Sequence, residues 1–256
     1  MSFRLATWNV NSLKVRLPHL LDWLATAQPD AVCLQETKTE DANFPRDALQ
    51  AAGYHAVFCG QKAYNGVAIL SRNAPTEVQH GIPDFADDPK RVIAATVDGI
   101  RVVCLYAPNG QSPGSDKYAY KLRWYEALAA WLEKDLANYP QLAVLGDLNV
   151  APEDRDVHDP KRWAGQIHVS EPERAAMRRV VELGLADAFR LFPQPEREYS
   201  WWDYRLLAFQ RNWGLRIDHI LLSPALAERC TACTIDKAPR RLDRPSDHAP
   251  VIADLR

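Results

Sequence analysis

Short apolar runs that end in a carboxylate or an amide recur along this chain, and this pattern constrains the fold more than any other feature. Placing a charged side chain costs little free energy where a strand reaches water and much more inside a core. One such case is an ordinary capped turn, but five in apolar settings indicate a shared polar pocket where strands converge. The polar residues at these points are Asn9, Asn11, Glu36, Asp147, Asn149, Asp218, Asp247 and His248.

Strand-like runs alternate with amphipathic stretches over the whole sequence, which indicates a mixed α/β fold. The expected strands are Phe3–Val10, Ala31–Gln35, His55–Cys59, Val67–Ser71, Val92–Val97, Arg101–Tyr106, Gln141–Leu145, Tyr199–Trp202, Ile217–Ser223 and Pro250–Leu255. The expected helices are Pro18–Ala27, Asp47–Ala52, Lys117–Asn138 and Glu171–Leu183. No Gly/Ser-rich or Pro-rich linker divides the chain, so we expect a single domain over residues 1–256.

Charge and hydropathy exclude two classes of protein. Lys and Arg total 31 against 33 Asp and Glu, a formal net charge of −2, which excludes a strongly basic protein that coats nucleic acid non-specifically. No apolar run approaches the roughly 20 residues that span a bilayer, and the N-terminus shows no leader pattern. We therefore expect a cytoplasmic protein with no membrane partner. No apolar stripe calls for a dimer, so we also expect a monomer.

Hard oxygen ligands gathered in one pocket favour a divalent cation. Mg²⁺ and Mn²⁺ are bound in proteins by few carboxylates, and water and phosphate oxygens complete their coordination shell. Turn capping explains neither a Glu after Gln35 nor a His beside Asp247. The sequence therefore predicts a Mg²⁺ site at which Mn²⁺ can substitute.

Six short motifs occur in an order that is far more specific than any one of them. They are WNVNSL at residues 8–13, LQETK at 34–38, YAPNG at 106–110, GDLNV at 146–150, RIDH at 216–219 and SDHAP at 246–250. From residue 3 to residue 255 the chain resembles the exonuclease III family of AP endonucleases and 3′-repair nucleases, within the endonuclease/exonuclease/phosphatase superfamily. The resemblance implies a four-layered, DNase-I-like α/β sandwich: two mixed sheets face to face, helices outside, and the active site at one edge.

The resemblance also implies which residues handle the metal and the attacking water. Glu36 resembles the principal metal ligand, with Asn9 beside it and Asp247 contributing. Asp147 resembles the residue that positions or deprotonates the attacking water. These roles suit a metal-dependent phosphoesterase that hydrolyses bonds in nucleic acid.

The remaining motif residues resemble groups that handle the phosphate. Asn149 and Tyr106 resemble those that hold the scissile phosphate or the pentavalent transition state, and Asp218 and His248 resemble the family's Asp–His pair. A phosphodiester repels hydroxide until its negative charge is neutralised, and a divalent cation together with an imidazolium supplies that positive field. Pairing with Asp218 is expected to raise the pKa of His248 and keep it charged near neutral pH.

Contacts with DNA are expected from local patches, because the total charge is near zero. Arginines at 205, 211 and 216 are interleaved with five aromatic residues in the 201–216 segment, and aromatics can stack on unpaired bases. The resemblance places Trp201 in a pocket for a flipped abasic sugar, with Leu215 and Ile217 as apolar neighbours. The expected substrate-binding residues are Asn11, Asn109, Gln166, His168, Trp201, Arg216 and Ile217. The expected partner is double-stranded DNA with damaged or blocked 3′ ends or abasic sites.

The loop at 159–170 departs from the pattern of many relatives, which carry an Asn followed by small residues and an aromatic one. This chain has Gln166 and then His168 instead. A bulky side chain there would crowd an extrahelical abasic nucleotide, whereas a 3′-phosphate needs no flipped nucleotide. We therefore expect 3′-phosphatase, 3′-phosphodiesterase and 3′–5′ exonuclease activity with poor abasic-site incision. Two alternatives stay open: an inert His168 on a solvated loop, and AP endonuclease as the main activity.

The same motifs also allow two other interpretations of the function. The Glu, Asp–Asn and Asp–His elements are shared with superfamily enzymes that hydrolyse inositol phosphates, sphingomyelin or RNA tails. A non-catalytic binding module with this fold is the third reading, but such a module would be expected to lose a ligand or the histidine. A cluster of unpaired carboxylates without a metal is electrostatically unfavourable. The Glu, Asp–Asn and Asp–His elements are all present in this chain.

Overall fold

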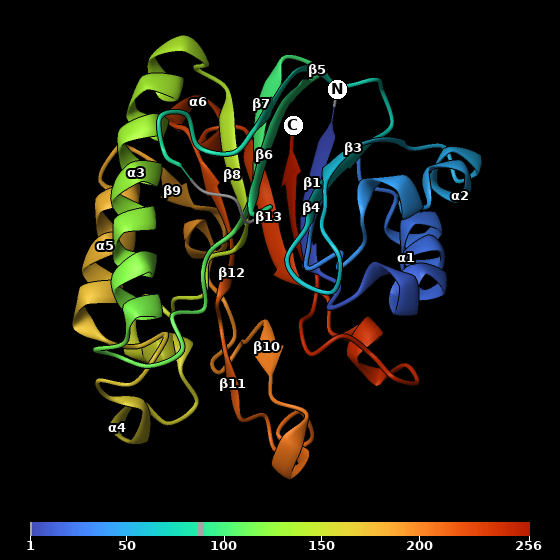
Figure 1. Ribbon diagram of the computed structural model, residues 1–256. Helices are drawn as coiled ribbons and strands as arrows, with labels where there is room; N and C mark the ends of the chain where they lie inside the picture. Colours follow the sequence, from blue (N-terminus) through green and yellow to red (C-terminus); the bar gives the residue numbers. More distant parts are fainter. Residues whose placement is uncertain (1, 87–89) are drawn as a thin grey trace.

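Two six-stranded sheets pack face to face, and helices cover their outer faces (Figure 1). The computed structural model describes residues 2–86 and 90–256. The covering helices are α1 (Leu13–Ala27) and α2 (Arg46–Ala51) on one side, and α3 (Asp116–Asn138) and α5 (Glu171–Val181) on the other. The expected four-layered α/β sandwich is confirmed.

Each sheet mixes parallel and antiparallel pairs. The first has the order β13-β14-β1-β2-β4-β3, with bounds Cys230–Ile235, Val251–Leu255, Phe3–Asn9, Ala31–Gln35, Val67–Ser71 and His55–Cys59. The second has the order β5-β6-β7-β8-β12-β9, with bounds Thr76–His80, Val92–Val97, Ile100–Tyr106, Leu142–Asp147, Asp218–Leu222 and Ala186–Asp187.

Smaller elements complete the chain. The short ribbon of β10 (Trp201–Trp202) and β11 (Gly214–Leu215) projects below the sandwich in Figure 1. The short helices are α4 (Pro160–Trp163) and α6 (Pro224–Ala227), and the 3₁₀ turns are Asp41–Asn43, Asp154–Asp156, Ala188–Leu191, Arg205–Leu207 and Ala238–Arg241. Within the described part of the chain, no helix is both long and apolar enough to cross a bilayer.

Three apolar layers hold the sandwich together. Side chains such as Ile69, Val102 and Ile220 meet between the sheets, and all are almost fully buried. Trp124 and Leu128 of α3 pack on the outer face of one sheet, while α1 covers the other. Central strands that are buried on both faces read as continuous apolar runs, which is why the sequence revealed them.

Three elements differ from what the sequence led us to expect. The first helix starts at Leu13 rather than Pro18, because Leu13 is fully buried against the sheet and the proline is accommodated inside the helix. Strand β5 was not expected, because its exposed edge carries polar residues such as Glu77 and Gln79 in place of an apolar run. Strand β13 was not expected either, and only its β-branched stretch at 231–235 hinted at it.

The strand register brings the polar strand ends together at one edge. Asn9 pairs with Gln35 in the parallel β1–β2 ladder, so the next residue, Glu36, lies beside Asn9. Tyr106 and Asp218 both pair with Asp147, from the neighbouring strands β7 and β12. Since β1 begins near the label N in Figure 1 and runs downward, this edge is the lower end of the sandwich.

Candidate active site

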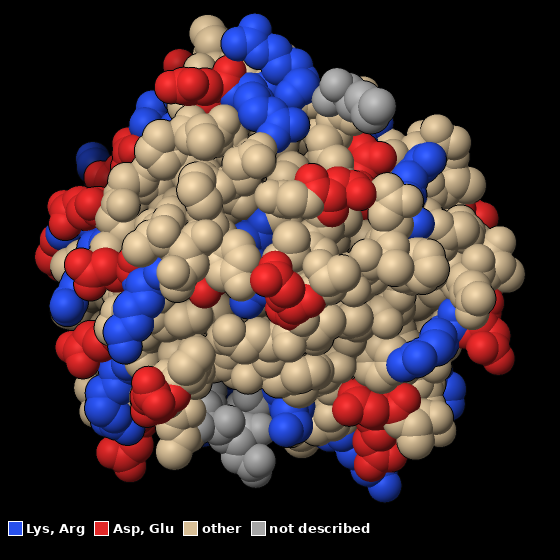
Figure 2. Space-filling view, turned by 90° about the horizontal axis from the view of Figure 1, so that it is seen from above, with Lys and Arg blue, Asp and Glu red and all other residues tan. Residues whose placement is uncertain are grey.

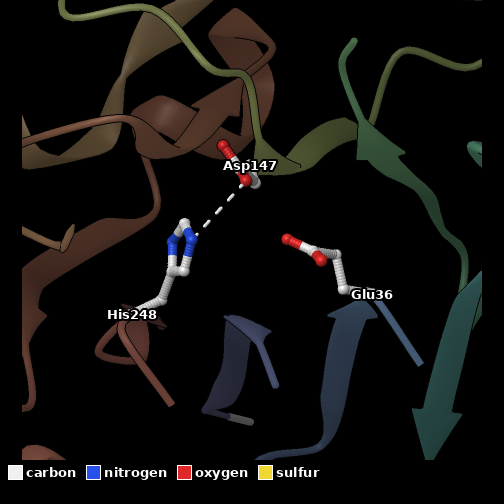
Figure 3. A group of neighbouring side chains, drawn as sticks. All are labelled: Glu36, Asp147 and His248. Atoms are coloured by element: carbon white, nitrogen blue, oxygen red, sulfur yellow. Dashed lines mark ion pairs between the residues drawn. The ribbon is translucent and has the colours of Figure 1, made fainter. Parts of the chain in front are cut away.

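Glu36, Asp147 and His248 converge from three separate segments. One potential ligand atom from each lies within 4.8 Å of the others, and Figure 3 shows all three side chains pointing into a common space. Glu36 leaves the end of β2 with a left-handed backbone, φ 50°, which turns it out of the strand. Asp147 ends β8 and His248 precedes β14. The predicted convergence of strand-end carboxylates is confirmed.

Asn9 links the two carboxylates. Its Nδ2 donates to Glu36 Oε1 at 2.8 Å and to Asp147 Oδ2 at 3.0 Å, while its Oδ1 accepts from the Asn11 backbone N–H at 3.0 Å. Asn9 thus lies beside Glu36 as expected, and it fixes the spacing of the two acidic groups.

Asp247 lies outside the group formed by Glu36, Asp147 and His248 among the described residues, so its expected contribution to the metal site stays a prediction. Its two oxygens accept from Asn11 Nδ2 at 2.8 Å and from Trp201 Nε1 at 3.0 Å. Burial alone would raise the pKa of Asp247, but the His248 imidazolium and these hydrogen bonds outweigh burial and lower it. Asp247 is therefore a carboxylate that fixes the positions of the Asn11 and Trp201 side chains.

Asp218 and His248 form the expected pair. His248 Nδ1 donates to Asp218 Oδ2 at 2.9 Å, and Ser200 Oγ donates to the same oxygen at 2.7 Å. Burial lowers the pKa of His248, but the Asp218 and Asp147 carboxylates outweigh burial and raise it to about 10. The ring is therefore an imidazolium at neutral pH, and its Nε2 lies 3.8 Å from Asp147 Oδ2.

Asp147 combines burial with several charged neighbours. Burial raises its pKa; His248 opposes that effect and Asp218 adds to it, so that the pKa is about 7. The Asn149 backbone N–H donates to Asp147 Oδ1 at 2.9 Å and fixes the carboxylate plane. A carboxylate with a pKa near 7 is well matched to accept a proton from water.

Tyr106 and Asn149 lie at the same edge as Asp147. Burial, reinforced by the Glu36 and Asp147 carboxylates, raises the pKa of Tyr106 well above its usual value, so the phenol stays protonated and can donate. Asn149 has a left-handed backbone, φ 53°, and its Nδ2 donates to the Ala107 carbonyl at 2.9 Å. These positions suit the phosphate contacts expected of both residues.

The sequence did not identify Lys38 and Ser200 as site residues. Lys38 Nζ lies 2.9 Å from Glu36 Oε2 and 2.6 Å from Asn11 Oδ1, so it neutralises Glu36. Its signal was the LQETK motif, which places a lysine two residues after the glutamate. No sequence pattern indicates Ser200, because it hydrogen-bonds a carboxylate that is distant in the sequence.

His168 is buried at the rim of the cluster, so its side chain is not solvated as one alternative expected. It is 6% exposed, and its Nδ1 donates to the Asn149 carbonyl at 2.7 Å. Asn109 Nδ2 then donates to Nε2 at 3.3 Å, and the ring centre lies 6.5 Å from that of Trp201. Burial lowers the pKa of His168 to about 3, so the ring is neutral. Gln166 is exposed, and its Nε2 donates to the Arg162 carbonyl instead.

Arg216 does not face substrate, which contradicts the expectation for this residue. Its guanidinium is 1% exposed and is paired with Asp156 at 2.7 Å and Asp187 at 2.8 Å. Ile217 is 2% exposed and packs with Leu215 in the apolar cluster against which Trp201 lies, so both are neighbours of Trp201 as expected. Arg216 therefore forms buried ion pairs that stabilise the fold. Ile217 belongs to the apolar cluster against which Trp201 packs.

The donor set fits a hard divalent cation. Glu36 and Asp147 supply carboxylate oxygens, whereas a protonated His248 has no lone pair to offer a metal. A metal-binding carboxylate pair that faces an imidazolium at one end of a two-sheet sandwich defines the class of metal-dependent phosphoesterases.

Comparison with known proteins places the chain within this class. The family model described as Endonuclease/Exonuclease/phosphatase family matches residues 6–248 of the sequence. The chain therefore belongs to that family. Exodeoxyribonuclease III of Haemophilus influenzae is 38% identical over 98% of both chains.

Two solved structures share nearly the whole fold. The 3′ phosphatase NExo from Neisseria, bound to a product DNA hairpin, has a TM-score of 0.98 with 45% identity over 99% of both chains. An AP endonuclease from Archaeoglobus fulgidus has a TM-score of 0.95 with 42% identity over 98% of both chains.

Proposed function

We propose that this chain hydrolyses phosphoester bonds at DNA 3′ ends, as a Mg²⁺-dependent 3′-phosphatase, 3′-phosphodiesterase and 3′–5′ exonuclease. The observation that carries the proposal is the buried Asp147 carboxylate facing the His248 imidazolium across the space beside Glu36. Relatives described as a 3′ phosphatase and as exodeoxyribonuclease III support the choice of substrate. We further propose that residues 1–256 form one domain and that the protein is a cytoplasmic monomer.

Each residue of the cluster takes a distinct part in the proposed reaction. Glu36, with Asp147 adjoining, would hold a divalent cation, which neutralises phosphate charge when bound. Asp147 accepts the proton of the attacking water, because its pKa of about 7 leaves it ionised in a large fraction of molecules. The His248 imidazolium and the Tyr106 phenol donate to phosphate oxygens, and Asn149 holds the same group.

The proposed substrate is double-stranded DNA with a blocked or damaged 3′ end. The 201–216 segment that would contact it includes β10 and β11, which lie at the lower end of the sandwich in Figure 1. Figure 2 shows the opposite end, where Lys and Arg are interspersed with Asp and Glu. A chain with a net charge of −2 is thus expected to engage DNA locally, through the rim of the site.

The deciding experiment compares three matched duplexes that carry a nick with a 3′-phosphate, an internal abasic site, or neither. We expect Mg²⁺-dependent phosphate release from the first, no release in EDTA, and recovery with Mg²⁺ or Mn²⁺. Glu36→Gln should lower kcat by about 100-fold or more, with an unchanged melting temperature. Undiminished activity in Glu36→Gln would refute the proposed metal site. Release from none of the DNA duplexes, with hydrolysis of another phosphoester, would refute the substrate.

AP endonuclease as the main activity is the second candidate. The similarity to an AP endonuclease from Archaeoglobus fulgidus at 42% identity favours it. The buried ring of His168 beside Trp201 favours 3′-end processing instead, because it fills space next to the expected abasic-sugar pocket. The same three duplexes separate the two candidates through the ratio of abasic incision to phosphate release.

A further inference from the structure

The tryptophans that are not buried gather around one cavity. Of the eight tryptophans, five are buried: Trp8, Trp23, Trp124, Trp131 and Trp202. The other three, Trp163, Trp201 and Trp213, are partly exposed, and all of them line a cavity of about 500 Å³. Large rings are normally enclosed by the core, and partly exposed aromatic rings that cluster mark a surface for a ligand or partner.

An apolar loop tip borders the same cavity. Leu206 lines it and is 68% exposed, and its neighbour Leu207 is 60% exposed. Both residues have left-handed backbones, with φ of 59° and 53°, a region that L-residues with bulky side chains avoid. Backbone strain that presents apolar side chains to water is typical of binding loops.

The cavity adjoins the candidate active site through one shared wall. Trp201 lines the cavity, yet its Nε1 donates to Asp247 at 3.0 Å and its backbone forms a β-bridge with His248. The expected abasic-sugar pocket, by contrast, would use the side of Trp201 toward Leu215 and Ile217, which do not line this cavity. A group seated here therefore lies next to, and outside, the position of the reacting phosphate.

The charges at the rim suit nucleic acid. Arg162 and Arg205 both line the cavity; Arg205 is paired with Asp203 at 2.7 Å. Among the described residues, Arg162 has no carboxylate within ion-pair distance, so its charge is available to a phosphate. Aromatic faces with a nearby arginine are the usual platform for unpaired bases.

We propose that this cavity binds an unpaired nucleobase of the DNA substrate, next to the 3′ end that the catalytic cluster processes. The inference rests on the proposed function and adds that the enzyme favours ends whose terminal base is unpaired. The occupant is a base because the lining is apolar and aromatic, and because Arg162 at the rim offers a positive charge to the adjoining phosphate. A peptide or a second copy of the chain is the competing occupant.

The test uses two 3′-phosphate duplexes that differ only in whether the terminal base pair is matched or mismatched. Binding is measured by fluorescence anisotropy in EDTA, so that it does not depend on cleavage. Wild type should bind the mismatched end more tightly. Trp213→Ala should weaken binding of the mismatched end about tenfold and leave the matched end unchanged, since a stacked base contributes roughly that factor.

Because Trp213 also packs against neighbouring residues, a surface variant provides a second readout. Leu206→Asn keeps a residue that tolerates a left-handed backbone, and it should weaken binding of the mismatched end about threefold. Val78→Asn on β5, also an exposed apolar residue but at the far end of the sandwich, is the matched control and should change nothing.

The outcomes separate this inference from the proposed function. Equal binding of matched and mismatched ends by wild type, or equal loss on both ends in Trp213→Ala and Leu206→Asn, would overturn the base site. Concentration-dependent dimers that Leu206→Asn abolishes would show that a second copy occupies the cavity. A wild type that prefers the mismatched end but releases no 3′-phosphate would refute the proposed reaction and leave the base site standing.

Discussion

At the scale of residues, we propose that the buried His168 ring sets the substrate preference of the candidate active site. Its ring is fixed by Asn149 on one nitrogen and by Asn109 on the other, and burial lowers its pKa to about 3. A neutral ring cannot strengthen phosphate binding through charge, so its effect on substrate choice is steric. The backbone at this residue is left-handed, φ 69°, which glycine adopts without strain.

We predict that His168→Gly raises the ratio of abasic incision to 3′-phosphate release by about tenfold to a hundredfold. Removing the ring opens space beside Trp201, and misplacing a substrate by about 1 Å costs roughly a hundredfold in rate. The measurement is kcat/KM on the abasic and 3′-phosphate duplexes. His80→Ala, at an exposed position on β5 far from the site, is the control and should leave the ratio unchanged. A constant ratio in His168→Gly would show that crowding is not the cause.

Residues at strand ends could be assigned from sequence, whereas residues that act across the fold could not. Glu36 and Asp147 each follow an apolar strand, so their local pattern was sufficient. Arg216 also sits beside a motif, but its side chain turns inward to Asp156 and Asp187, and no local pattern shows that direction. The hydrogen bonds of Asp247 could not be predicted for the same reason, because its partners are residues 11 and 201.

At the scale of elements, α3 and α5 brace the loops of the site through one buried ion pair. Lys121 on α3 pairs with Glu173 on α5, and both side chains are 0% exposed. Lys121 Nζ also donates to the carbonyls of Asn109 and Asn149, at 3.2 and 2.7 Å. Glu173 accepts from the His168 backbone N–H at 3.0 Å. The two helices therefore fix three loops that carry substrate-side residues.

We predict that Lys121→Met lowers the free energy of unfolding by about 3–5 kcal/mol, because it leaves Glu173 buried without a partner. The double variant Lys121→Met/Glu173→Leu should lose less than the sum of its two single variants, since no uncompensated charge remains. Urea unfolding followed by circular dichroism measures both effects.

The control for this pair lies on α5, the helix that carries Glu173. Arg178→Met breaks the exposed ion pair with Glu171 and should change stability by less than about 1 kcal/mol. If Lys121→Met and Arg178→Met had equal effects, the buried pair would not brace the loops as argued.

Helices and strands with many buried residues were easier to predict from the sequence than exposed or very short ones. Strands such as β2 and β8, buried at every position, appeared as continuous apolar runs. The exposed edge strand β5 and the two-residue strands β9 and β11 leave no such run, so tertiary pairing alone reveals them. Helix α1 extends five residues before Pro18, because burial of Leu13 outweighs the usual tendency of proline to sit in the first turn.

At the scale of the whole molecule, buried neutral histidines make stability depend on pH. Burial, reinforced by Arg216, lowers the pKa of His219 to about 4, and its Nε2 donates to the Val150 carbonyl at 3.0 Å. Below pH 6.5 the unfolded chain binds a proton at this residue that the folded chain does not bind. The free energy of unfolding therefore falls as pH drops from about 6.5 to about 4.

We predict that His219 accounts for about 3 kcal/mol of this loss, from a shift of its pKa from 6.5 to about 4. His219→Gln should flatten the dependence of the unfolding free energy on pH in that window, and urea titrations at half-unit intervals would show it. His55→Gln, at an exposed position on β3, serves as the control. An unchanged slope in His219→Gln would refute the assignment.

The pairing of β1 with β14 joins the two ends of the chain in one sheet, and the cluster draws its members from residues 9 to 248. A variant truncated before residue 237 would carry Glu36 and Asp147 but not the His248 imidazolium. It would also lack the final strand that holds the first one in place. The candidate active site is thus expected to form only when segments separated by more than 200 residues have folded together, because no single stretch of the chain carries more than part of it.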